Sequence, residues 1–176
     1  AVQTPQLLQL SGIGNSEDLA LNGIRCLHPL KGVGKNLQDH LDIMVQYYCK
    51  DPKLSAARYI KVSNMVRVLL QYMLFGNGPG AENGCVAGAF IKSRKDMEMP
   101  DLQFHFIPLI LSDHGRERFT EPGLSIHVCQ LRPESRGEVK LASKNPLDNP
   151  SIKANYLSAR SDLDTLVEGV KLARKI

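Results

Sequence analysis

The stretch that decides the fold reads Gly32-Val33-Gly34-Lys35-Asn36-Leu37-Gln38-Asp39-His40-Leu41-Asp42. It joins two glycines to a run of polar and charged residues and leads directly into a β-strand pattern. Gly32 and Gly34 allow positive φ angles and a close approach of another part of the chain. The loop would present Asp39, His40 and Asp42 at the mouth of a strand, where binding and catalytic groups commonly lie. A polar turn in which Asp39 and His40 bond their own backbone is equally compatible with these residues.

Downstream of this loop, several short segments have the composition of β-strands. Turns rich in proline, glycine and aspartate separate them, and side chains of different character alternate along residues 43–49 and 102–107. Because few helices intervene, the pattern predicts an α+β fold, mostly an antiparallel sheet with helices packed on it. The predicted strands are residues 43–49, 86–91, 102–107, 124–131 and 138–141.

The first predicted helix lies near the start of the chain. Thr4 is a typical N-cap, and Pro5 suits the first helical position, where its missing N–H costs nothing. Its apolar face would be formed by Leu7, Leu8 and Leu10.

Three further helices are predicted. Asn15, or the serine after it, would cap a short helix that stops at Gly23. Residues 62–75 place apolar side chains at helical spacing, which favours packing into a core, with a membrane-surface helix as the alternative. A last helix would begin at Ser161, with Asp164 completing a capping box.

Residues 76–81 contain Gly-x-Gly-x-x-Ala, the outline of a dinucleotide-binding fingerprint. That fingerprint requires a strand before it and a helix after it, so that phosphate meets the N-terminus of the helix. Here a helical pattern precedes the glycines and Pro79 interrupts them. We therefore interpret the segment as a loop.

Composition excludes several classes of protein. With 43% hydrophobic and 23% charged residues, the chain is an ordinary globular sequence. The net charge of +4 comes without any block of basic residues, which argues against nucleic acid as a partner. No apolar run approaches the roughly 18 residues of a transmembrane helix. The four cysteines form no Cys-x-x-Cys pair, which disfavours a metal site and favours free, buried thiols in a reducing compartment. The sequence does not fix the location; we expect an intracellular protein, of the cytoplasm or of a mitochondrion if eukaryotic, with association to a membrane as an open alternative.

His105 is a candidate functional residue within the predicted strand 102–107. Alternation places Leu102, Phe104 and Phe106 on one face, and His105 on the less apolar face with Gln103 and Ile107. On sequence alone, a single strand histidine is more typical of a structural group than of a catalytic one.

Longer motifs link the chain to a known family. The sequence "GVGKNLQDH" of residues 32–40 and the opening "AVQTPQLLQLSGIG" resemble signatures of the glucose–methanol–choline (GMC) family of flavin-dependent alcohol oxidoreductases. Within that family, the resemblance is to choline dehydrogenases and acceptor-linked aliphatic alcohol dehydrogenases in particular. Further similar segments follow in family order, at residues 100–108, 113–116, 135–137 and 155–158.

The resemblance implies an enzyme that oxidises a primary alcohol, choline or an aliphatic alcohol, to an aldehyde by hydride transfer to FAD. It implies that residues 1–42 end a Rossmann-like FAD-binding domain and that residues 43–176 belong to the substrate-binding domain. The family's N-terminal glycine fingerprint and the His-Pro motif that carries its principal catalytic histidine are missing. His28-Pro29 lies too far upstream to be that motif, and we interpret it as a turn. We therefore expect an internal piece of a longer protein, inactive by itself.

The resemblance also carries over individual roles. Asp42 would face the trimethylammonium group of choline, since an anion opposite a permanent cation offsets the desolvation of both. His105 would position the substrate oxygen. Further substrate-binding residues would be His40 and Asn83, and the residues near the cofactor would be Ala1, Thr4 and Pro5.

A second hypothesis comes from a different class of protein. The same fold could serve as a non-catalytic binding or scaffold module that has lost its flavin. The sequence upstream of Ala1 would separate the two hypotheses. The electron acceptor and the oligomeric state have no signature in these residues.

Overall fold

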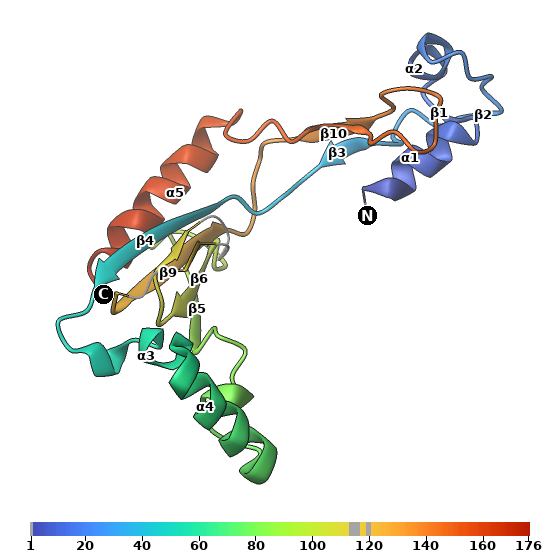
Figure 1. Ribbon diagram of the computed structural model, residues 1–176. Helices are drawn as coiled ribbons and strands as arrows, with labels where there is room; N and C mark the ends of the chain where they lie inside the picture. The colour runs from blue at the N-terminus through green and yellow to red at the C-terminus, as the bar shows by residue number, and fades with distance from the viewer. Residues whose placement is uncertain (1, 113–116, 119–120) are drawn as a thin grey trace. The chain divides into compact units, whose positions relative to one another are not determined.

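The computed structural model describes residues 2–112, 117–118 and 121–176 (Figure 1). The chain divides into two compact units. One combines the residues up to 40 with residues 133–163, and the other combines residues 41–132 with residues 164–176. Both units contain antiparallel sheets and helices, which confirms the predicted α+β class.

The first unit holds two small sheets. One is a parallel pair of strands, and the other is an antiparallel sheet in the order β11-β10-β3. His28-Pro29, which the sequence suggested as a turn, instead forms a short strand that pairs with β1. The elements are α1 (Gln3–Leu10), β1 (Ile13–Gly14), α2 (Ser16–Leu21), β2 (His28–Pro29), β3 (Lys35–Leu37), β10 (Gly137–Lys140) and β11 (Ser151–Lys153).

Helix α1 docks on β10 through an amide side chain. Gln9 Nε2 donates to Val139 O at 3.1 Å, and Gln9 Oε1 accepts from Leu141 N at 3.0 Å. The buried residues of α1 are Gln6 and Gln9, while Leu7 is 66% exposed. The predicted leucine face was therefore wrong, because the neighbouring strand offers backbone polar groups that an amide satisfies and a leucine cannot.

The starts of the first two helices differ in how well they were predicted. Val2 already has helical angles, so α1 begins at Gln3, and Thr4 lies inside the first turn instead of capping it. Asn15 does cap α2, since its side chain accepts from Glu17 N at 2.9 Å and from the next backbone N–H at 3.2 Å.

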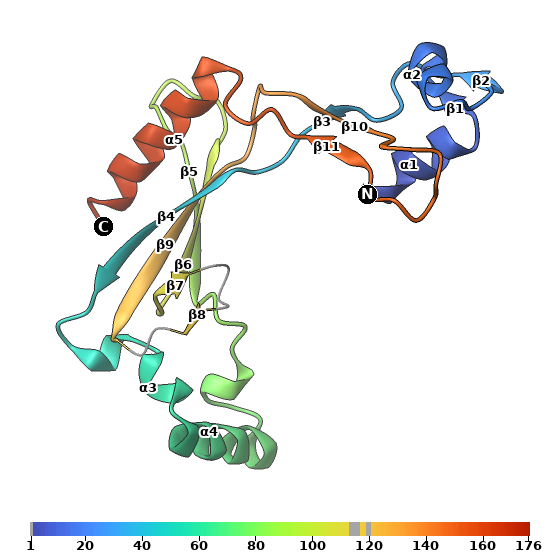
Figure 2. The ribbon, with the colours of Figure 1, turned by 45° about the horizontal axis from the view of Figure 1, so that its top comes forward.

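The second unit is built on a four-stranded antiparallel sheet in the order β4-β9-β6-β5. Figure 2 shows these strands running side by side, with β9 between β4 and β6. A two-stranded ribbon, β7 with β8, follows β6 in the chain. The strands are β4 (Asp42–Tyr48), β5 (Ala87–Ile91), β6 (Leu102–Ile107), β7 (Leu111–Ser112), β8 (Glu117–Arg118) and β9 (Gly123–Gln130).

Helix α5 (Arg160–Ala173) covers one face of this sheet (Figure 1). The core between them consists of Leu102, Phe104, Ile126, Val128 and Ala173. Gly169 allows the close approach, because a Cβ there would lie 2.5 Å from Val128 Cγ1. The helix begins at Arg160, so Ser161 is not the predicted cap; its hydroxyl instead donates to Glu134 Oε2 at 2.7 Å.

The rest of this unit is helical. The main element is α4 (Val62–Phe75), which has the predicted bounds and ends where Gly76 adopts a left-handed conformation. In the described part of the chain no side chain of α4 is buried, so the predicted core role was wrong: its main neighbours, α3 (Ala57–Ile60) and the short turn η2 (Pro79–Ala81), are too small to cover it. A helix and not a strand precedes Gly76, which confirms that residues 76–81 are not a dinucleotide-binding fingerprint.

The unit also contains a 3₁₀ turn, η1 (Pro52–Leu54), which precedes α3.

Candidate active site

A carboxylate, two imidazoles and a thiol lie on the face of the four-stranded sheet that α5 does not cover. The strand register pairs Asp42 with Cys129 and His105 with His127. Residues directly opposite each other in a sheet share a face, and residues two apart on one strand do so as well. Asp42, His105, His127 and Cys129 therefore lie together, opposite the core residues, and we call them the polar cluster.

Asp42 and His127 are bonded to each other. His127 Nδ1 lies 2.5 Å from Asp42 Oδ2, and the two side chains are 16% and 37% exposed, respectively. The second ring nitrogen, His127 Nε2, is buried and has no hydrogen-bond partner among the described residues. An unpartnered buried polar atom is uncommon in a native structure and calls for an explanation.

Cys129 and His105 complete the cluster. The Cys129 Sγ atom lies 4.0 Å from His105 Nδ1. Burial, together with the charge and hydrogen bonding of the nearby Asp42 carboxylate, raises the pKa of the Cys129 thiol to about 12. Cys129 is therefore a neutral thiol at physiological pH, which makes it a packing and hydrogen-bonding group and not a nucleophile.

The sequence of β9 explains why His127 and Cys129 lie here. Along Gly123–Gln130, Ile126 and Val128 alternate with the less apolar side chains of the cluster. The sequence predicts a strand here, but it does not by itself mark His127 or Cys129 as functional residues. At the other end of the same face, Gln46 Nε2 donates to Leu111 O at 2.6 Å, so the segment after β6 covers that end.

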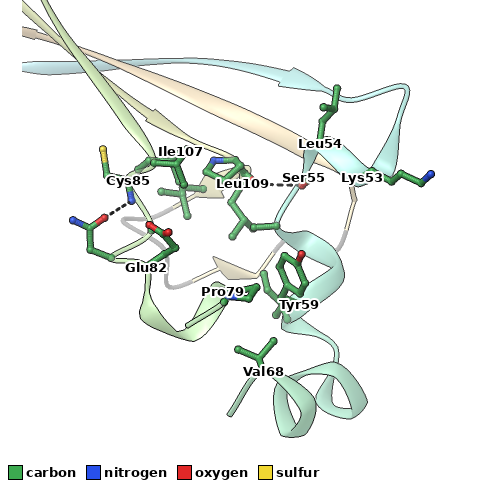
Figure 3. Close-up of a pocket in the computed structure, with 18 residues that line it drawn as sticks. Lys53, Leu54, Ser55, Tyr59, Val68, Pro79, Glu82, Cys85, Ile107 and Leu109 are labelled. Carbon is green, nitrogen blue, oxygen red and sulfur yellow. Dashed lines mark hydrogen bonds between the residues drawn. The ribbon is translucent and has the colours of Figure 1, made fainter. Parts of the chain in front are cut away.

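Asn83 lies at a different place in the same unit. It lines a pocket of about 760 Å³ whose walls come from α3, η2 and the segment after β6 (Figure 3). Its side chain accepts a hydrogen bond from Cys85 N at 3.0 Å. The lining includes neither His105 nor Asp42, although Ile107, two residues after His105 on β6, is part of it. Among the described residues, Ile107 is thus the one lining residue that lies on the same face of the four-stranded sheet as the polar cluster.

The remaining predicted site residues belong to the first unit. His40 is exposed at its edge. Asp39 Oδ1 accepts from His40 N at 2.9 Å, which is the local turn bonding that the sequence left open, and Asp39 Oδ2 accepts from the Tyr156 hydroxyl. Thr4 is exposed in the first turn of α1. Pro5 follows it there, half-buried, while Ala1 and the motif of residues 113–116 lie outside the described residues.

Across residues 2–112, 117–118 and 121–176, no group of three or more histidine, cysteine or acidic side chains could hold a metal ion. No helix within those ranges is long and apolar enough to cross a membrane. The four cysteines are free, and Cys129 alone among them is buried.

Comparison with known sequences defines the class of this protein. Two family models described as GMC oxidoreductase match it, over residues 1–42 and 133–176. Two relatives are each 41% identical over all 176 residues: an oxygen-dependent choline dehydrogenase of Chromohalobacter salexigens and an alcohol dehydrogenase [acceptor] of Pseudomonas putida. The chain belongs to the GMC oxidoreductase family. It spans 31% and 32% of the length of these two relatives.

A solved structure shares the fold. A variant of the Aspergillus oryzae formate oxidase superposes with a TM-score of 0.88 over 98% of this chain and 34% of its own. The two sequences are 24% identical. At this identity, the likeness shows that the two chains share the same backbone fold.

Proposed function

We propose that this chain forms part of an FAD-dependent oxidoreductase that acts on the CH–OH group of a primary alcohol, either choline or an aliphatic alcohol. The names of the two relatives support this class of substrate. The observation that carries the proposal is the polar cluster, because two residues implicated by the family resemblance, Asp42 and His105, lie on one open face of the sheet. Had they lain on opposite faces, one small alcohol could not have touched both.

The described residues of α1 are compatible with a bound flavin. Among the described residues, no side chain caps the start of this helix, so the first-turn N–H groups beside the exposed Thr4 are available to a polar ligand. The chemistry that FAD supplies when bound is the acceptance of a hydride from the alcohol carbon, which leaves an aldehyde.

The chain's own residues would bind and orient the alcohol. His105 would hydrogen-bond the substrate oxygen near the middle of β6, and Asp42 would complete the polar end of the site from β4. The pocket that Ile107 helps to line is formed largely by apolar side chains, among them Val68, Pro79 and Leu109. It could take the hydrocarbon chain of an aliphatic alcohol.

The test uses the full-length gene product, purified and scanned for the absorbance of bound flavin. Oxidation of choline and of a medium-chain aliphatic primary alcohol is then followed with an artificial electron acceptor. We expect stoichiometric flavin and turnover of at least one of the two alcohols. Absence of both flavin and turnover would favour the non-catalytic module instead.

A further inference from the structure

The unexplained atom in the polar cluster is His127 Nε2. His127 lies between the two proposed substrate-binding residues: it is the cross-strand partner of His105, and its Nδ1 is bonded to Asp42 at 2.5 Å. If His105 and Asp42 face the substrate, then the ring between them faces it too. This step rests on the proposed function.

The partner of Nδ1 decides what Nε2 can do. A carboxylate only accepts hydrogen bonds, so the nitrogen that faces it must carry a proton. In the neutral imidazole the other nitrogen then holds a lone pair and acts as an acceptor. A carboxylate that fixes a histidine tautomer in this way is a familiar arrangement around metals and in catalytic triads. His127 Nε2 is therefore a buried acceptor in need of a donor.

We propose that His127 is a substrate-binding residue whose Nε2 accepts a hydrogen bond from the hydroxyl group of the alcohol, and that Asp42 is the positioning residue that holds its tautomer. Asp42 then acts through His127, and its effect does not depend on a positive charge in the substrate. This assignment differs from the one that the family resemblance suggested, in which Asp42 is the counter-ion of choline.

Two substitutions of His127 separate substrate binding from a merely structural bond to Asp42. An asparagine places its NH₂ near the position of Nδ1 and can still donate to Asp42, but it offers nothing at Nε2. A glutamine places an amide near the position of Nε2 and can accept there, but it cannot reproduce the bond to Asp42. Substrate binding predicts that H127Q retains more activity than H127N, whereas a structural role predicts the reverse order.

The experiment measures kcat/KM in the full-length flavin-loaded protein, with choline and with a neutral primary alcohol of similar size. We expect H127N to lower kcat/KM for both alcohols by roughly 10- to 100-fold, the effect of one lost buried hydrogen bond. D42N should also lower both, and adding it to H127N should cause little further loss. A D42N effect confined to choline, or an H127N enzyme as active as wild type, would overturn the proposal.

Matched controls come from the same residue types elsewhere in the chain. His28 is exposed, and the side chain of Asp96 is 73% exposed in a surface ion pair with Arg94. H28N and D96N should leave kcat/KM unchanged. Circular dichroism and flavin content show whether each variant is folded.

A second readout does not depend on turnover. Histidine labelled with ¹⁵N reports by NMR which ring nitrogen carries the proton, and the His127 signals are those that disappear in H127Q. We expect a protonated Nδ1 and an unprotonated Nε2 in the wild type, and a mixture of tautomers in D42N. A proton on Nε2 in the wild type would overturn the proposal even if the protein oxidises alcohols. A protein without flavin or alcohol oxidation would instead refute the proposed function on which it rests.

Discussion

Gly34 and Val139 are in direct backbone contact in the first unit. Val139 N donates to Gly34 O at 2.6 Å, and a Cβ added to Gly34 would overlap the carbonyl oxygen of Val139. Gly34 also has a φ of +76°, a conformation that side chains disfavour. The second glycine of the "GVGKNLQDH" motif is thus explained by packing against β10.

Replacing Gly34 with alanine should therefore destabilise the first unit. The left-handed φ and the overlap with Val139 together predict a loss of about 2–5 kcal/mol. Denaturant unfolding of the purified protein measures it. Gly32→Ala is the matched control, because nothing lies within 4 Å of a Cβ at Gly32 and its φ is not positive. Equal stability of the two variants would contradict this explanation.

The contact of α5 with the sheet predicts a second effect of alanine. Although alanine favours helices, Gly169→Ala would push a methyl group against Val128 Cγ1, where a Cβ lies at 2.5 Å. Val128 is fully buried and stiff at χ1, so overpacking should prevail and lower the stability by about 1–3 kcal/mol. A rise in the melting temperature would show instead that α5 shifts freely on the sheet.

Ser55 provides a third prediction, because its buried hydroxyl ties three segments together. It donates to Gly123 O at 2.9 Å or Pro108 O at 3.1 Å, and it accepts from Gly123 N at 3.0 Å. Ser55→Ala leaves these backbone groups without that partner and should cost about 1–3 kcal/mol. The exposed Ser63 on α4 is the control, and Ser63→Ala should change the unfolding free energy by no more than about 0.5 kcal/mol.

The raised pKa of Cys129 predicts how this thiol reacts. With a pKa of about 12, it remains protonated at mildly alkaline pH and should resist iodoacetamide there. Asp42→Asn removes a negative charge that favours the protonated form, so the pKa should fall and alkylation at a given pH should become faster. Peptide mass spectrometry follows the modification, with the half-buried Cys85 as an internal reference. An unchanged rate in the variant would mean that burial alone protects the thiol.

Local patterns predicted the elements whose determinants are local. The bounds of α4 and β6 follow from periodicities of their own side chains, and Asn15 caps α2 through backbone groups two and three residues away. The face of β6 that carries His105 could be predicted for the same reason, since alternation along a strand needs no information from the rest of the chain.

Features that depend on distant partners were predicted poorly. Gln6 and Gln9 are buried because they bond backbone groups more than a hundred residues away, which no helical pattern reveals. The pairing of residues 133–163 with the start of the chain is equally non-local. His127 was overlooked because its significance depends on a neighbour in another strand, Asp42, although its alternation along β9 could have placed it on the face shared with His105.

Strand β9 contributes to both faces of the four-stranded sheet, because successive residues along it point to opposite faces. Val128 supports the hydrophobic interior, while His127 and Cys129 supply the chemical groups on the far side. Inserting or deleting one amino acid within Gly123–Gln130 would exchange the two sets and spoil stability and chemistry together. Natural length variation near this strand should therefore be confined to the connections on either side of it.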